Sequence, residues 1–120
     1  MTKIVFFRSG GEFYGFEEQG HTGYGEEGED ILCAAISSMT FFLINTIECA
    51  YQSDVQYDID PEDPRITVRS KAALPEFEPD ESKRFAVSGI FYGYYLQLTD
   101  MLEEQGDYME VSVVDLPWKD

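Results

Sequence analysis

The stretch GHTGYGEEGEDILCAAIS, residues 20–37, joins a glycine-rich acidic loop to the start of an apolar segment. Its four glycines leave the backbone free of the usual steric limits, which predicts a loop. From Ile31 to Ile47 the chain has no charged residue, and such a run predicts a helix that is packed on more than one side. The rest of the chain is built around this loop and helix.

Before the loop, residues 3–8 and 12–18 are β-branched and aromatic runs on either side of Ser9-Gly10-Gly11. Two such runs with a tight glycine turn predict an antiparallel hairpin. After the helix, residues 55–60 and 65–71 alternate apolar and polar side chains around a proline-rich turn, which predicts a second hairpin with half-exposed strands.

Asp30 is predicted to cap the first helix, which places Cys33 in its first turn and its end near Tyr51. A second helix is predicted from the acidic start at Asp80 to Gln105, with Gly106 at the C′ position. Residues 108–116 alternate again and predict a last strand. The order ββαββαβ predicts an α+β two-layer sandwich, with one sheet of about five strands and two long helices.

The chain of 120 residues is predicted to form a single domain, residues 1–120. It has 24 acidic and 8 basic residues, a formal charge of −16, which disfavours direct binding to nucleic acid or an anionic membrane. The charge has two interpretations, attraction of a basic partner or solubility alone. The second helix carries many aromatic residues beside a strip of small ones, Ser88, Gly89 and Gly93, and this predicts self-association.

The two cysteines, Cys33 and Cys49, fall on one predicted helix about 24 Å apart, too far for a disulfide. Free thiols and a Met1-Thr2-Lys3 start without signal-peptide character predict a cytoplasmic protein. The uncharged run is shorter than the ~20 residues of a membrane span and contains polar side chains, so we predict a buried helix of a soluble protein.

Cys33 and His21 are the candidate catalytic residues. A cysteine in the first turn of a helix is readily deprotonated, because free backbone N–H groups stabilise its thiolate, and the same groups are candidates for an oxyanion hole. His21 is the only histidine and therefore the only candidate base. The alternatives are a cysteine that is a small buried hydrophobe, which is how we interpret Cys49, and a histidine that merely lies on the surface.

Two neighbours of the pair have open interpretations. Asp30 either caps the helix or orients His21, and Ser37 either hydrogen-bonds near the thiol or bonds the carbonyl four residues before it. We predict neither a metal nor a cofactor, because the chain lacks CxxC and HxxxH spacing and a phosphate-binding lysine.

Gly20-His21, Gly28 and the run Asp30 to Ser37 together resemble the signature of the ribosomal-processing cysteine protease family, known as Prp. The resemblance implies an endopeptidase that removes a short N-terminal extension from a large-subunit ribosomal protein. It implies Cys33 as nucleophile, His21 as base, and Gly20, Asp30 and Ser37 as supporting positions. It also implies a cytoplasmic homodimer with a basic ribosomal protein as substrate. Thr22 and Leu32 stand where the family commonly has alanine and valine.

A second hypothesis is a non-catalytic acidic module that binds a basic ribosomal partner through the glutamates of the loop and the turn at residues 58–63. Such a module would bind in a salt-sensitive way that survives replacement of Cys33.

Overall fold

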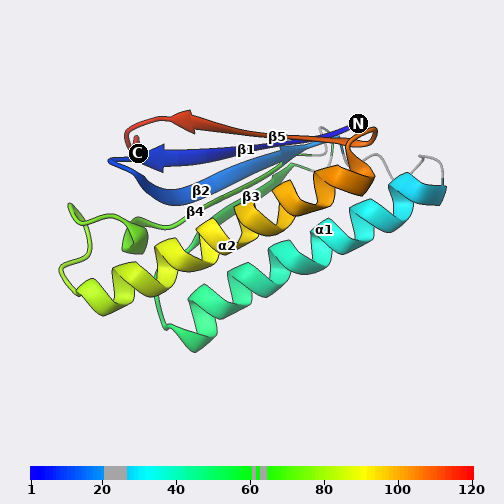
Figure 1. Cartoon of the computed structure of the whole chain (residues 1–120). Helices are drawn as coiled ribbons and strands as arrows, with labels where there is room; N and C mark the ends of the chain where they lie inside the picture. Colours follow the sequence, from blue (N-terminus) through cyan, green and yellow to red (C-terminus); the bar gives the residue numbers. More distant parts are fainter. Residues whose placement is uncertain (21–26, 61, 63–64) are drawn as a thin grey trace.

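The computed structural model describes residues 1–20, 27–60, 62 and 65–120, and for residues 27–30 it describes the backbone alone. Figure 1 shows one sheet with both long helices on the same face. The predicted α+β class and the order ββαββαβ are confirmed. The elements are β1 Thr2–Ser9, β2 Glu12–Gln19, α1 Glu27–Asn45, a π-helical turn Thr46–Ala50, β3 Gln56–Asp60, β4 Arg65–Arg69, a 3₁₀ turn Lys71–Ala73, α2 Glu81–Gln105 and β5 Met109–Asp115.

The sheet has the strand order β3-β4-β2-β1-β5, which the sequence pattern did not predict. Both predicted hairpins are present, β1 with β2 and β3 with β4, each antiparallel. Gly10 and Gly11 make the first turn with φ of 58° and 85°, a region that glycine enters without a steric penalty. The last strand, β5, pairs parallel to β1, so the start of β1 lies inside the sheet.

The core lies between the sheet and the two helices. On the sheet side, Ile4, Phe6 and Phe16 are almost fully buried and point toward the helices. Phe6 and Phe16 each pack a ring edge against Tyr94 of α2, with ring centroids 5.8 and 5.0 Å apart. Edge-to-face contacts of this kind add to the burial of apolar area, so α2 is fixed to the middle of the sheet.

Helix α1 begins at Glu27, four residues before Ile31, which was predicted to be its first residue. Asp30 is therefore inside the helix and the prediction that it is the N-cap is wrong. Glutamate has a high helix propensity and is favoured near a helix N-terminus, and both effects extend the helix into the end of the acidic loop.

The segment Ile31–Ala50 is long and apolar enough to cross a membrane by length and composition, with a hydropathy of 1.6. The core helix of a soluble protein passes the same test. Here 33% of the window is buried. Leu32, Ile36, Leu43 and Ile47 lie in the core, whereas Ile31, Phe41 and Phe42 are exposed, so the helix packs along one face and is not the buried helix that was predicted.

Two other details differ from the predictions. All five residues of β3 are exposed, because β3 is an edge strand and the helices leave its side chains uncovered, whereas half were expected to be buried. Asp80 caps α2 as its composition suggested, but Gly106 has a φ of −61°. A side chain at Gly106 would come within 2.7 Å of the Leu102 carbonyl oxygen, so close packing explains this glycine better than a left-handed C-cap.

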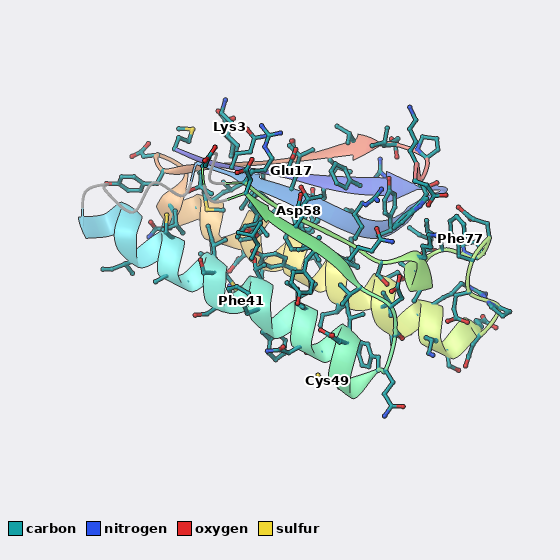
Figure 2. The ribbon with its side chains drawn as sticks, turned by 180° about the vertical axis from the view of Figure 1, so that it is seen from behind. Lys3, Glu17, Phe41, Cys49, Asp58 and Phe77 are labelled. Carbon is teal, nitrogen blue, oxygen red and sulfur yellow. The ribbon has the colours of Figure 1, made fainter. Side chains whose placement is uncertain are left out.

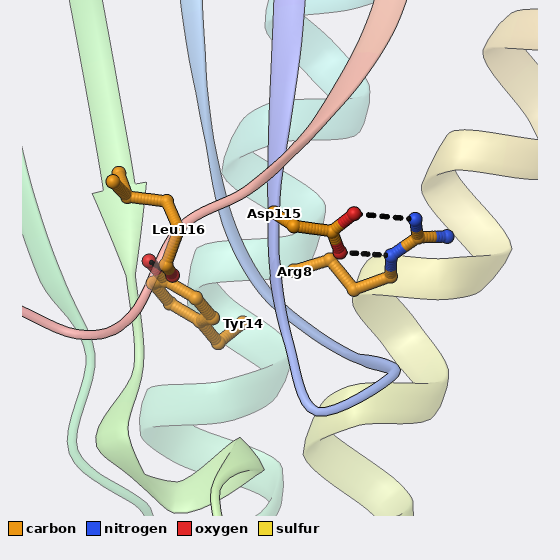
Figure 3. A network of polar contacts seen from close by, with 4 residues as sticks. All are labelled: Arg8, Tyr14, Asp115 and Leu116. Atoms are coloured by element: carbon orange, nitrogen blue, oxygen red, sulfur yellow. Dashed lines mark hydrogen bonds and ion pairs between the residues drawn. The ribbon is translucent and has the colours of Figure 1, made fainter.

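The C-terminal segment crosses the outer face of the sheet, opposite the helices. Tyr14 donates a hydrogen bond of 2.6 Å to the Leu116 carbonyl oxygen. Arg8 donates two hydrogen bonds to the Asp115 carboxylate, which are the dashed lines in Figure 3. Beyond them, the Arg69 guanidinium lies 4.1 Å from the centre of the Trp118 ring. These contacts hold the chain end at the sheet end that is far from the start of β1.

Replacing Asp115 with asparagine is expected to cause a small loss of stability at neutral pH that disappears in acid. The hydrogen bonds from Arg8 hold the pKa of Asp115 below its usual 3.8. A carboxylate with a lowered pKa stabilises the fold above the unfolded-state value, and this contribution is lost as the pH falls through the folded-state value. Urea midpoints of the two proteins at neutral pH and near pH 2 measure this. An equal difference at both pH values would contradict it.

Candidate active site

Cys33 lies on α1 at the end of the sheet where β1 begins. Its side chain is half-buried, and its Sγ is 3.8 Å from the Oγ1 of Thr2. Thr2 is itself buried, and its backbone N–H donates a hydrogen bond of 2.9 Å to the carbonyl oxygen of Tyr108. A hydroxyl held in this way is a suitable hydrogen-bond donor to a thiolate, and the half-buried sulfur remains accessible from one side.

The early start of α1 changes the position of Cys33 within the helix. Cys33 is the seventh residue of the helix, in its second turn, and not in the first turn as predicted. The free N–H groups of an α-helix belong to its first four residues, and the influence of the helix dipole declines within the first turn. The N–H of Cys33 is therefore used inside the helix, and neither activation of its thiol nor an oxyanion hole rests on it.

Gly20 is held close to the first residues of the chain. Its φ is +91°, and a Cβ built on it would lie 2.3 Å from the Met1 carbonyl oxygen and 3.4 Å from the Thr2 Cα. Cys33 and Gly20 thus both contact the start of β1. The structure brings together two of the five site residues predicted from the sequence.

The other three predicted residues are only partly covered by the structure. Ser37 is half-buried one turn after Cys33, on the same face of α1. Asp30 lies on the helix, but its side chain is outside the description. His21 lies outside the described residues altogether, so the Cys33–His21 pair stays a prediction.

A polar cluster between β2, α1 and α2 was not predicted from the sequence. Glu18 is fully buried and its Oε1 accepts hydrogen bonds from Thr40, at 2.8 Å, and from Tyr94, at 2.5 Å. The signal was its spacing, since Glu18 is two residues after the buried Phe16 and so on the same face of β2. A glutamate near a strand end is usually solvated, so this spacing alone did not predict that Glu18 is buried.

The second cysteine has a different setting. Cys49 is exposed in the turn Thr46–Ala50 that continues α1, so its interpretation as a small buried hydrophobe is wrong. Figure 2 shows it at the end of this helical segment that is far from the start of α1. Among the described residues no group of three or more histidine, cysteine, aspartate or glutamate side chains is placed to hold a metal ion.

Comparison with known protein families shows which family the chain belongs to. The model of the family described as cysteine protease Prp matches residues 1–110. The chain belongs to the cysteine protease Prp family. The match covers every element that carries the candidate site, from β1 through α2, and it confirms the resemblance seen in residues 20–37. No curated protein sequence matches the chain.

Solved structures share the Prp fold. The crystal structure of SMU.848 from Streptococcus mutans is 25% identical, with a TM-score of 0.79 over 97% of this chain and 99% of that one. A Staphylococcus aureus Prp in complex with a substrate peptide is 18% identical, with a TM-score of 0.77 over 95% and 100% of the two chains. A second structure of Staphylococcus aureus Prp, with a covalently linked product peptide, is 19% identical, with a TM-score of 0.74 over 95% of this chain and 100% of that one.

Proposed function

We propose that the protein is a cysteine endopeptidase that removes the N-terminal extension of a large-subunit ribosomal protein in the cytoplasm. Cys33 is the nucleophile and His21 the general base and acid, with Gly20, Asp30 and Ser37 in supporting positions. In the reaction the Cys33 sulfur attacks the carbonyl carbon of the scissile peptide and His21 takes the thiol proton. His21 then returns a proton to the leaving amine, and water hydrolyses the thioester.

The observation that carries the proposal is the position of Cys33. Of the two cysteines, it is the one that lies at the end of the sheet where Gly20 contacts the first residues of the chain. Gly20 is the last described residue before His21. A family of cysteine proteases requires a cysteine near a base, and Cys49, exposed near the far end of the helix, has no histidine near it in the sequence.

The substrate assignment is supported by chemistry and by the relatives. Ribosomal proteins are basic, and a chain with a formal charge of −16 attracts them. The Staphylococcus aureus protein is described as a ribosomal processing protease and has been crystallised with a substrate peptide and with a covalently linked product peptide. A covalent peptide is the species expected of nucleophilic catalysis by a thiol.

The direct test is cleavage of the ribosomal protein from the same organism, supplied with its N-terminal extension and analysed by intact-mass spectrometry. We expect one cut that releases the extension, with the cut site unchanged when salt is raised. Binding that weakens with salt and is not followed by any cut would favour the acidic binding module instead.

We also propose that the protein is a homodimer that uses the outer face of α2. Phe85, Tyr92 and Leu96 are exposed on the same face of this helix, at 82%, 47% and 46%. Gly89 and Gly93 lie between them, and an added Cβ at either would meet nothing within 4 Å. A second helix can approach such a surface closely, and the large side chains beside it supply the apolar area.

Replacing Leu96 with glutamate is expected to produce a monomer, because a charge in the centre of an apolar interface loses its water without gaining a partner. Light scattering coupled to gel filtration should give about twice the 13.7 kDa chain mass for the wild type and the single mass for the variant. Ile59→Glu on β3, with the same exposure of 46%, is the matched control and should stay dimeric. Two variants with the same mass would contradict the α2 interface.

A further inference from the structure

A buried carboxylate cluster, defined as Glu18, Thr40 and Tyr94, joins the three elements that surround the candidate site. The Glu18 side chain is 0% exposed. Its Oε1 accepts hydrogen bonds from Thr40 Oγ1 at 2.8 Å and from Tyr94 Oη at 2.5 Å, and the two hydroxyl oxygens are 3.0 Å apart. Glu18 belongs to β2, Thr40 to α1 and Tyr94 to α2.

Stability alone is a poor explanation for a carboxylate at this position. Its neighbours on the helix-facing side of the sheet are Phe16, on the same strand, and Ile4, opposite it in the register. Moving a carboxylate out of water costs several kcal/mol, and an apolar side chain would pack against such neighbours without that penalty. What a carboxylate adds is direction, since hydrogen bonds constrain angle and distance while apolar contacts are non-directional.

The donors to this carboxylate are permanent ones. Burial, and after it the negative charge of Glu18, raises the pKa of Tyr94 well above its usual range. The phenol therefore keeps its proton wherever the protein is folded and continues to donate. A threonine hydroxyl does not titrate at all, so the geometry of the cluster does not depend on the state of its donors.

Two elements connect the cluster to the candidate site, the helix α1 and the strand β2. Thr40 is seven residues after Cys33, two helical turns, on the face of α1 that also carries Ser37. Glu18 is two residues before Gly20 on the strand that leads to His21. A hydrogen bond between Thr40 and Glu18 therefore fixes the rotation of the cysteine-bearing helix relative to the strand end that precedes the base.

We propose that Glu18 is a positioning residue which, through Thr40 and Tyr94, sets the rotation of α1 on the sheet and hence the direction in which Cys33 presents its sulfur. This inference rests on the proposed function. It assigns no contact with substrate to any of the three side chains. A misplacement of about 1 Å at the reacting atoms lowers turnover by as much as about 100-fold. A small rotation of α1 caused by a change at Thr40, seven residues after Cys33, is therefore expected to have a measurable effect on turnover.

A matched pair at Thr40 separates positioning from packing. Thr40→Val keeps the shape and loses the donor, whereas Thr40→Ser keeps the donor and loses a methyl group. We expect Thr40→Val to lower kcat by about 10-fold or more with KM within about twofold, and Thr40→Ser to stay near the wild-type kcat. If packing alone mattered, the serine variant would be the more impaired of the two, and that order would overturn the proposal.

A second pair compares two buried tyrosines. Tyr94→Phe removes a donor to Glu18, and Tyr14→Phe removes the 2.6 Å bond to the Leu116 carbonyl on the outer face of the sheet. Burial raises the pKa of both phenols, so both act as neutral donors. We expect both variants to lose stability and only Tyr94→Phe to lose turnover. Equal kcat values for the two would overturn the proposal.

Alkylation of the thiols gives a readout that does not require proteolysis. Mass spectrometry measures the rate of iodoacetamide addition at Cys33 relative to Cys49, the exposed thiol near the far end of the helix. We expect this ratio to change severalfold in Thr40→Val and Glu18→Gln and to stay constant in Tyr14→Phe. If the wild type cleaves nothing, the proposed function fails and the alkylation ratio decides the inference by itself. A ratio that is constant in all variants overturns it.

Discussion

Replacing Cys33 with alanine is expected to lower kcat/KM for removal of the ribosomal extension by about 10⁴-fold or more. Alanine has no nucleophile, so the thioester cannot form and only binding remains. The change removes one sulfur atom from a half-buried side chain whose described polar contact is Thr2. The melting temperature should therefore change little, and cleavage followed by mass spectrometry measures the loss of turnover.

Cys49→Ala is the matched control for this result. It makes the same chemical change on the same continuous helical segment, at an exposed residue, and should retain wild-type turnover. A Cys33→Ala variant that still releases the extension would exclude Cys33 as the nucleophile. Retained salt-sensitive binding of the ribosomal protein by this variant is expected as well, because the negative charge of the chain is unchanged.

Replacing Gly20 with alanine is expected to destabilise the fold by at least about 2 kcal/mol and also to reduce the turnover of the protein that remains folded. Alanine pays a backbone penalty of about 1–3 kcal/mol in this positive-φ conformation. In addition its Cβ would lie 2.3 Å from the Met1 carbonyl oxygen, so the end of β2 and the start of β1 must separate. That movement displaces Thr2, which contacts Cys33. Urea unfolding and kcat of the folded variant measure the two effects.

Gly10→Ala separates the backbone penalty from the clash. Gly10 also has a positive φ, +58°, but an added Cβ would meet nothing within 4 Å. We expect a loss of about 1 kcal/mol and unchanged turnover. Equal losses at the two positions would mean that the contact between Gly20 and Met1 has no role in stability or catalysis.

The local features of the fold could be predicted because each depends on neighbours in the sequence. Alternation predicted the strands, the Ser9-Gly10-Gly11 turn predicted the first hairpin, and the Asp80 cap with an acidic start predicted α2. The order of strands in the sheet could not be predicted from the alternation of apolar and polar residues. The parallel pairing of β5 with β1 joins residues about 107 positions apart, and no short stretch of sequence specifies it.

The candidate site likewise has residues that could be predicted from the sequence and residues that could not. Residues 20–37 contain a motif, and the family match over residues 1–110 agrees with it. The error at Asp30 arose because a helix start was assigned to the strongest capping residue, while the glutamates before it continue the helix. Of the residues near the cysteine and its helix, Thr2, Glu18 and Tyr94 come from three other elements, β1, β2 and α2, and carry no spacing signal relative to Cys33.

The sequence by itself determined the elements and their order, the family and the identity of the candidate nucleophile and base, because propensity, periodicity and motifs act over a few residues. Only the tertiary structure decided what surrounds Cys33. It placed Cys33 in the second turn of α1 beside Thr2, brought Gly20 against Met1, and buried Glu18 between α1 and α2. The physical reason is that these contacts depend on how whole elements pack, through burial of apolar area and hydrogen bonds between residues far apart in the chain.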